Sequence, residues 1–247
     1  MSALNKAQLR AVRWYIGDVE GSDPFWSDPK AYVTLNALFF PGLTAERARA
    51  AEGKRLNPAI VSDGKRLGCV LCDLMSAFQS FGREQTTYRV ERFSDFERMR
   101  ERGGTLSFTS TSTAGFLPAY QDRVGIALMR FALTPETPCI PMAEVLPHYA
   151  KADEAEVLLP PGMRLALTEL SLTDAERSIL DAKGEPPVLS VCAKPEGMES
   201  LEGFWEVPDC PVPGVLDALN EGREPADVGA YLEWKRGLNE YRIVNNE

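Results

Sequence analysis

The sequence predicts an α+β fold in which a helical N-terminal portion precedes a mainly antiparallel β core. Up to about residue 82, apolar side chains recur at the spacing of a helix face. Beyond Gly82 the chain changes to short segments in which apolar and polar residues alternate, most of them bounded by Pro or Gly. Because these segments follow one another through short links, an antiparallel sheet is favoured.

The predicted helices are marked by apolar stripes and by start signals. The first covers much of residues 3–19, and a second begins at Asp28, an N-cap residue followed by proline at the first helical position. Thr44 is expected to cap a short third helix and Asp63 to cap a fourth. The stripes are typical of core-facing surfaces, so we assign no chemistry to these helices.

The second half of the chain predicts at least six strands. A charged helix at about 93–102 separates the first two of them. The predicted strands are 86–92, 105–113, 124–134, 153–159, 163–170 and 188–193.

We expect one domain over residues 1–195, with a helical part at 1–82 and a β core at 83–195. Residues 196–247 would form a C-terminal extension that docks on this domain, with Phe204 and Trp205 pinning it. The alternative for this extension is a surface for a partner or for autoregulation.

Composition limits the possible partners. The net charge of −9 argues against binding to nucleic acid or to an anionic membrane, because both favour a basic surface. The chain has five cysteines, and Cys69 and Cys72 lack the second Cys or His pair that a zinc site needs. The N-terminus shows neither a signal-peptide core nor a transmembrane run. We therefore expect a reduced, cytoplasmic setting, or secretion into a host cell without a classical signal peptide.

The most informative stretch is 153–162, which reads Asp-Glu-Ala-Glu-Val-Leu-Leu-Pro-Pro-Gly. Val and Leu next to a hard stop favour a strand. Strand positions two apart point to the same face, about 6.5–7 Å from each other, so Glu154 and Glu156 would share one face. Like charges this close need solvent, a cation or a substrate with positive character to compensate them. The alternative is an edge strand blunted by charge.

Two further segments precede the glutamates. Arg89 follows Tyr88 on the first predicted strand, and Phe-x-Ser-Thr-Ser occupies 108–112. Singly, they are typical of a surface ion pair and of a turn or helix cap. In this order, behind a helical portion, the segments resemble the arginine–serine–glutamate class of mono-ADP-ribosyltransferases, which includes bacterial C2/C3-like toxins and effectors and vertebrate ecto-enzymes. The resemblance covers about residues 30–195 and extends to Tyr-Val-Thr-Leu-Asn at 32–36.

The resemblance implies an ADP-ribosyltransferase-like fold with a split β core, NAD as substrate and no metal. In this interpretation the planar fork of Arg89 suits phosphate oxygens, and Ser110 orients the ribose and braces the catalytic glutamate, Glu156. Cleavage of the nicotinamide–ribose bond builds positive charge at the anomeric carbon, which a fixed carboxylate stabilises. Glu154 would meet the acceptor, and in the family a glutamate there accompanies guanidinium acceptors, so arginine is favoured.

The sequence also departs from the family pattern. Val90 replaces the glycine that usually follows the arginine, and Lys151 stands where an aromatic residue is usual before the glutamates. The aromatic that stacks on nicotinamide would be Tyr120, with Phe116 as the reserve candidate. The implied NAD-binding set is Tyr88, Arg89, Ser110, Thr111, Ser112, Phe116, Tyr120 and Glu156.

The expected function is transfer of ADP-ribose from NAD to a side chain of an acceptor protein, with some NAD glycohydrolase activity. The acceptor would be a host or target-cell cytosolic protein. Two alternatives belong to other classes. One is a degenerate transferase fold that serves as an NAD or ADP-ribose binding module. The other is a transferase that modifies a small molecule, a nucleic acid or a serine or threonine.

Overall fold

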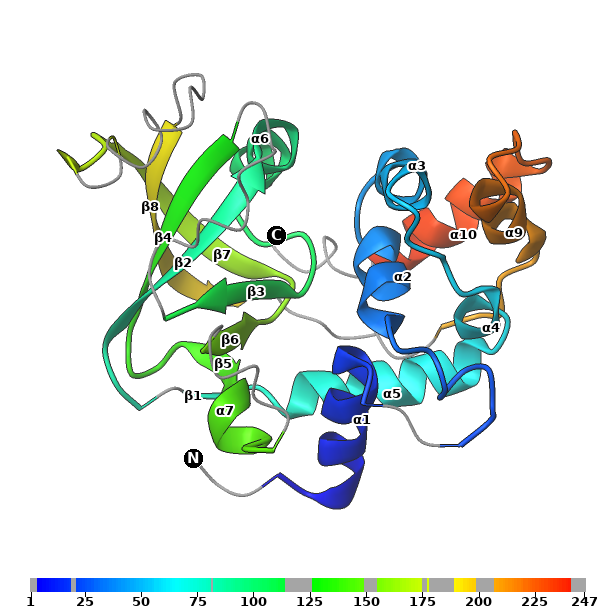
Figure 1. Cartoon of the computed structure of the whole chain (residues 1–247), viewed down its shortest axis with the longest axis horizontal. Helices are drawn as coiled ribbons and strands as arrows, with labels where there is room; N and C mark the ends of the chain where they lie inside the picture. Colours follow the sequence, from blue (N-terminus) through cyan, green and yellow to red (C-terminus); the bar gives the residue numbers. More distant parts are fainter. Residues whose placement is uncertain are drawn as a thin grey trace. The chain divides into compact units, whose positions relative to one another are not determined.

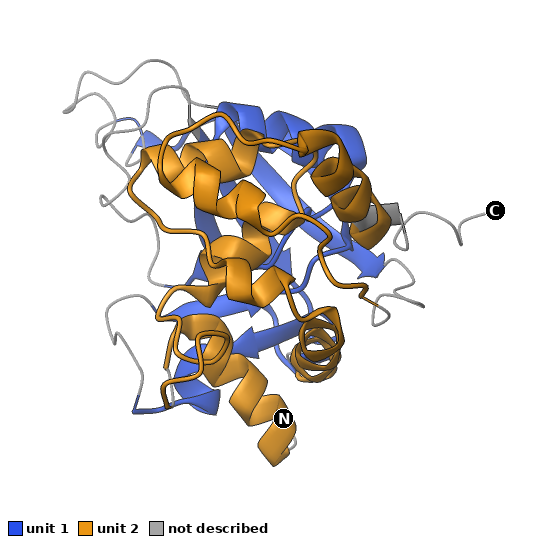
Figure 2. Cartoon of the chain, turned by 90° about the vertical axis from the view of Figure 1, so that its right-hand side faces the viewer, with its two compact units in different colours: residues 1–3, 78–198 blue, residues 4–77, 199–247 orange. Residues whose placement is uncertain are grey.

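The computed structural model describes residues 4–18, 21–80, 82–113, 126–148, 155–174, 177, 189–198 and 207–240. The chain divides into two compact units (Figure 2). Unit 1 consists of residues 1–3 and 78–198, and unit 2 of residues 4–77 and 199–247. Since the strands all lie in unit 1, the helical and β portions predicted from the sequence are present, and the α+β class is confirmed.

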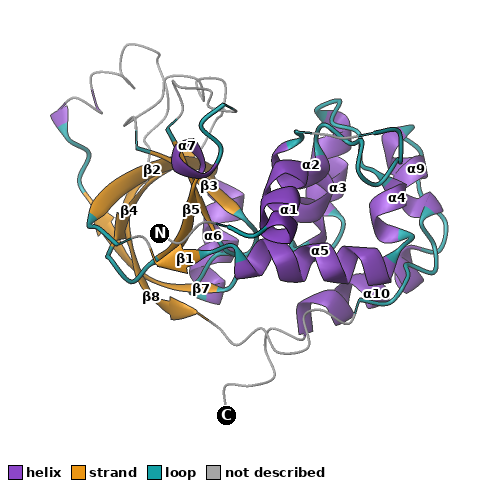
Figure 3. Cartoon of the chain, turned by 90° about the horizontal axis from the view of Figure 1, so that it is seen from below, coloured by secondary structure: helices purple, strands orange, loops and turns teal. Residues whose placement is uncertain are grey.

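Unit 1 is built on an eight-stranded sheet that curls strongly (Figures 1 and 3). Every neighbouring pair is antiparallel except β4 with β8, which is parallel. The prediction of a mainly antiparallel core is therefore confirmed. In spatial order the strands are β1 (Gln79–Ser80), β5 (Pro138–Pro141), β6 (Glu156–Leu159), β3 (Thr109–Ser112), β2 (Gln85–Arg92), β4 (Ile126–Leu133), β8 (Leu189–Met198) and β7 (Met163–Leu170).

Two of these strands were not predicted, and two predicted strands are shorter than expected. Prolines bound β5, which argues against a strand, yet its Ile140 pairs with Leu158 of β6. The predicted strand at 105–113 is reduced to β3, because Thr105 is committed to a turn. Its hydroxyl donates to Pro160 O at 2.8 Å and accepts from Met163 N at 2.9 Å. The glutamate-bearing strand begins only at Glu156.

One face of the sheet carries the apolar core of unit 1. Helix α6 (Phe93–Arg102) covers this core with the buried side chains of Phe96 and Met99 and ends at Gly103, whose φ of 71° is left-handed. The described residues of unit 1 also include the short helix α7 (Met142–Val145). The strand residues of the core are Ala127, Met129, Phe131, Leu133, Cys139, Val157, Leu159, Met163, Leu165, Val191 and Ala193.

The regular secondary structure described in unit 2 consists of helices joined by loops. Asp63 caps the helix that it was predicted to cap, accepting from Arg66 N at 3.0 Å, although this helix is the fifth and not the fourth. Thr44 is the first residue of its helix and not the cap. The second helix begins at Ala31 and not at Asp28, whose carboxylate accepts from Lys30 N. The helices are α1 (Lys6–Ile16), α2 (Ala31–Leu38), α3 (Thr44–Ala51), α4 (Pro58–Val61), α5 (Gly64–Ser76), α9 (Gly214–Asn220) and α10 (Val228–Glu240).

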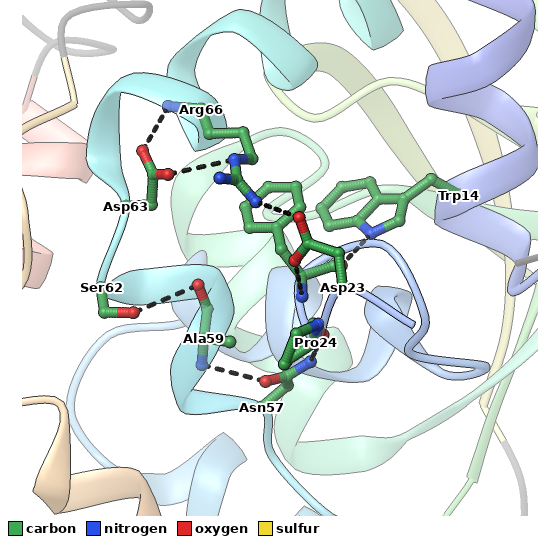
Figure 4. Close-up of polar contacts among 9 residues, drawn as sticks. Trp14, Asp23, Pro24, Asn57, Ala59, Ser62, Asp63 and Arg66 are labelled. Carbon is green, nitrogen blue, oxygen red and sulfur yellow. Dashed lines mark hydrogen bonds and ion pairs between the residues drawn. The ribbon is translucent and has the colours of Figure 1, made fainter. Parts of the chain in front are cut away.

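The loop between α1 and α2 is fixed by polar contacts to three other parts of unit 2 (Figure 4). Trp14 Nε1 donates to Phe25 O at 2.7 Å, and the Trp14 and Phe25 rings stack. Arg66 Nη1 lies 2.8 Å from Asp23 Oδ2, and Asn57 Nδ2 donates to Pro24 O at 2.9 Å. These contacts fix the geometry of an otherwise irregular segment.

The C-terminal residues 207–240 pack with the N-terminal helices of unit 2. Trp234 Nε1 donates to Pro208 O at 2.8 Å, and Gly64 N donates to the carboxylate of Asp209 at 2.8 Å. The expected anchors Phe204 and Trp205 lie outside the described residues. The expectation that residues 1–195 form one catalytic domain stays a prediction. In the described ranges, no helix has the length and apolar character of a membrane span.

Candidate active site

Three neighbouring strands of unit 1 carry the predicted site residues. Ser112 of β3 lies directly opposite Glu156 of β6 on one side and Tyr88 of β2 on the other. Residues directly opposite one another share a sheet face, with Cβ atoms about 4.5–5.5 Å apart. Ser110, two positions before Ser112, points to the same face. The fold therefore aligns Glu156, both serines and Tyr88 although they are far apart in the sequence.

The threonines of this segment hold β6 in place. Thr111 Oγ1 donates to Val157 O at 2.8 Å, and its side chain is buried. Thr113 N donates to Ala155 O at 3.2 Å, and the Thr113 hydroxyl donates to the same oxygen at 3.3 Å. The resemblance places Thr111 in the NAD-binding set. In the structure its hydroxyl donates to the backbone of β6, the strand that bears Glu156.

The residue before Glu156 has an unusual backbone. Ala155 has a φ of 40°, in the left-handed region that residues other than glycine, asparagine and aspartate seldom adopt. Such a conformation costs on the order of 1–3 kcal/mol and persists only where the surroundings impose it. Thr113 contacts Ala155 O through both its N–H and its hydroxyl, and the half-buried Glu156 follows at the start of β6.

Arg89 is bound tightly to its own surroundings. Its Nη1 donates to Ser110 O at 2.8 Å, and its Nε forms an ion pair with the carboxylate of Glu91, which is only 7% exposed. Among the described residues, the backbone pairing of strands β2 and β3 is at Tyr88 and Ser112. The Arg89 guanidinium therefore provides a second link between these strands at the level of Ser110.

Strand alternation separates Arg89 from its neighbour Tyr88. Arg89 lies opposite Met129 of β4, and Met129 belongs to the buried core. Its side chain consequently leaves β2 on the core face, whereas Tyr88 leaves on the face that carries Glu156. The sequence reasoning missed Glu91, although its position two residues after Arg89 on a strand is a signal that the two side chains are neighbours.

Several predicted residues cannot be placed. Glu154, Phe116 and Tyr120 lie outside the described residues, as does Lys151. Among the residues that are described, no group of three or more His, Cys, Asp or Glu side chains is arranged to hold a metal ion.

No protein-family model matches this chain. No curated protein matches it significantly. Solved structures with a similar fold include the ADP-ribosylating toxin BECa of a binary enterotoxin of Clostridium perfringens, solved with NADH. The match has 16% identity and a TM-score of 0.47, and it covers 78% of this chain but 44% of the toxin chain.

Two further matches are of similar quality. The C3 exoenzyme of Clostridium limosum shows 11% identity and a TM-score of 0.43, with 78% of this chain and 86% of the exoenzyme covered. The ADP-ribosyltransferase Vis toxin of Vibrio splendidus shows 15% identity and a TM-score of 0.40, with 78% and 74% covered. This chain spans less than half the length of the enterotoxin component. The likeness to these structures is one of fold.

Proposed function

We propose that this protein is an NAD-dependent mono-ADP-ribosyltransferase with Glu156 as its catalytic carboxylate. The observation that carries the proposal is the register of three neighbouring strands, β6, β3 and β2. It aligns Glu156 with Ser112 and with the strand of Tyr88 and Arg89, so the three motif segments identified in the sequence lie side by side.

The chemistry assigns one step to Glu156. When the bond between the ribose anomeric carbon and nicotinamide breaks, nicotinamide leaves with the bonding electron pair and the ribose becomes oxocarbenium-like. A carboxylate held beside that sugar stabilises the positive charge and can accept a hydrogen bond from a ribose hydroxyl. The strained turn at Ala155 and the Thr111 bond to Val157 O fix the strand from which this carboxylate projects.

The acceptor then attacks the same carbon and loses a proton. Arginine is the proposed acceptor residue, because a carboxylate at position 154 suits a guanidinium, which it can pair with bidentately. Attack by water in place of the acceptor gives NAD glycohydrolase activity. We place the acceptor protein in the cytosol of a target cell, in keeping with the class of toxins and effectors that the motifs resemble.

Replacement of Glu156 by Gln tests the proposal. Glu156→Gln should lower nicotinamide release and transfer by about 100–1,000-fold, because the charge is lost while the shape is kept. NAD should still bind, as calorimetry can show. Glu169→Gln is the matched control, since Glu169 lies exposed on β7 of the same unit. Activity of Glu156→Gln within about threefold of wild type would remove this carboxylate from the mechanism.

A further inference from the structure

Helix α5 carries two cysteines that the proposed function does not use. Cys69 and Cys72 are three positions apart within this thirteen-residue helix, and both are exposed free thiols. Residues three apart on a helix lie on the same face, with Cβ atoms about 5–6 Å from each other. Exposed free cysteines are uncommon, because free cysteine is among the residue types most often buried. We propose that Cys69 and Cys72 form a dithiol site that exchanges reversibly with disulfides, a property separate from the transferase chemistry.

The packing of α5 leaves the face of these two thiols open to solvent. The opposite side of the helix is buried in unit 2 through Leu67, Val70, Leu71 and Leu74. Asp63 caps the first turn by accepting from Arg66 N at 3.0 Å. Near the other end, Ser76 O accepts from Gln8 Nε2 of α1 at 2.8 Å. Because the helix is held at both ends and along its apolar side, both thiols stay on the exposed side.

The other three cysteines of the chain differ from this pair in exposure. Cys139 and Cys210 are buried, and Cys192 is partly exposed. Burial raises the pKa of the Cys139 thiol to about 12 and also raises the pKa of Cys210. The thiolate is the form that attacks a disulfide, so neither buried thiol is suited to exchange near neutral pH. Exposure and pairing together therefore distinguish the two cysteines of α5.

The exchange takes place in two steps. Partial desolvation and the charges of Asp73 and Cys69 raise the pKa of the Cys72 thiol, so we assign the first attack to Cys69. The Cys69 thiolate attacks one sulfur of a small disulfide such as glutathione disulfide, the S–S bond breaks, and one glutathione thiolate leaves. The Cys72 thiolate then attacks the Cys69 sulfur and releases the second glutathione. Two electrons pass from the protein thiols to the glutathione disulfide, and the departing glutathione thiolates take up the two protons.

The helix makes the oxidised pair easy to reduce again. A disulfide needs Cβ atoms about 3.5–4.5 Å apart, which is less than the spacing of about 5–6 Å on an undistorted helix. Closing the bond therefore distorts the turn of α5 between the two residues, and such strain makes a disulfide more reducible. The closed loop is also short, so the cross-link removes little chain entropy from the unfolded state. These properties suit reversible exchange better than a structural cross-link.

Mass spectrometry of the oxidised protein tests the site. Incubation with glutathione disulfide should lower the mass of the peptide that contains Cys69 and Cys72 by two hydrogens, and reduced glutathione should restore it. Cys69→Ser and Cys72→Ser each keep one thiol, so each should stop at a mixed disulfide with glutathione. Cys192→Ser is the matched control and should oxidise like the wild type. A wild-type protein that forms only mixed disulfides, or a disulfide that reduced glutathione does not reopen, would overturn the proposal.

A trivalent arsenical tests the proximity of the two thiols in the reduced, unaltered chain. Phenylarsine oxide forms two As–S bonds with a neighbouring pair of thiols and releases one water. The second bond forms within one molecule, so wild type should bind this probe at least about tenfold more tightly than either single serine variant. Equal affinity in the wild type and in the single variants would overturn the proposal. Both measurements are independent of NAD, so their outcome leaves the proposed transferase function unaffected.

Discussion

The side chain of Arg89 on β2 links this strand to β3. Arg89 contacts Glu91 through Nε and Ser110 O through Nη1, two contacts that point in different directions. A guanidinium can make both because Nε and Nη1 are separate donors held apart in a rigid planar fork, whereas a lysine ammonium offers all its donors from one nitrogen. The role we assign to Arg89 is therefore to position β3 and its serines.

Arg89→Lys is expected to break one of these two contacts. The link at Ser110 should loosen, and turnover should fall by about tenfold with a lower melting temperature, since each lost contact to a charged group is worth about 1.5–3 kcal/mol. Steady-state kinetics together with thermal unfolding checks this. A large loss of NAD affinity at an unchanged melting temperature would instead show that Arg89 contacts the diphosphate directly.

Glu154 is expected to act on the acceptor and not on NAD. A guanidinium is protonated near neutral pH and is a poor nucleophile, so a carboxylate that orients it and takes up its proton assists transfer. Glu154→Gln should therefore lose transfer to protein while keeping much of its NAD glycohydrolase activity. Mass spectrometry of the modified acceptor and a nicotinamide assay measure the two activities separately. A product linked to serine or threonine would contradict the arginine assignment while leaving the transferase assignment intact.

At the scale of helices and strands, the local sequence predicted individual helices and strands better than it predicted which strands pair. Asp63 caps its helix as expected, because an N-cap depends only on the next few residues, whereas the start signals at Asp28 and Thr44 did not mark a cap. The adjacency of Glu156 and Ser112 could not follow from periodicity, since β6 and β3 are neither consecutive nor joined by a tight turn. Their proximity was predicted only through the family resemblance.

The face on which a strand residue lies could not be predicted from the sequence alone either. Arg130 is a charged residue within the apolar segment of β4, and the pairing of β4 with β2 places it opposite Tyr88. A shift of that register by one residue would move Arg130 to the core face. The motif comparison selected Arg89 because it follows Tyr88 in the sequence, and the buried carboxylate of Glu91 became relevant only when the pairing of the strands was known.

Helices α3 and α10 are joined by a buried ion pair. Lys235 contacts the carboxylate of Glu46, and both side chains are almost fully buried. Lys235 Nζ also donates to Gly42 O at 2.7 Å, and Tyr231 donates its hydroxyl to Glu46 at 3.1 Å. Burial raises the pKa of Glu46 above its ordinary value, and the charge of Lys235 opposes that rise. Removing the lysine alone would leave a buried carboxylate without its compensating charge.

Lys235→Met should therefore lower the free energy of unfolding by about 3–5 kcal/mol at neutral pH. A carboxyl whose pKa is raised in the folded protein favours folding below its unfolded pKa, and this contribution is lost as pH rises through the folded pKa. The loss caused by Lys235→Met should accordingly be larger at about pH 8 than at about pH 5. The double variant Glu46→Gln with Lys235→Met serves as the control and should lack this trend in urea unfolding. The same pH dependence in both variants would contradict the explanation.

The charge of the whole molecule distinguishes its two proposed substrates. With a net charge of −9, the protein repels the diphosphate of NAD at long range and attracts a basic acceptor. A local cation is needed for the first substrate, while the overall field assists the second. Added salt screens such long-range effects, since the Debye length falls from about 10 Å at 0.1 M to about 3 Å at 1 M.

Transfer to an arginine-rich acceptor protein should thus be far more sensitive to salt than NAD glycohydrolysis. Because electrostatic steering raises association rates by about 10–1,000-fold, kcat/KM for the acceptor should fall by at least about tenfold as salt is raised. Glycohydrolysis at saturating NAD should change little, because water carries no charge and encounter with NAD no longer limits the rate. Transfer to free arginine whose α-amino and carboxyl groups are both blocked should show an intermediate salt effect, because this small acceptor carries a single positive charge. Equal salt effects on transfer and on hydrolysis would mean that the acidic surface plays no part in acceptor encounter.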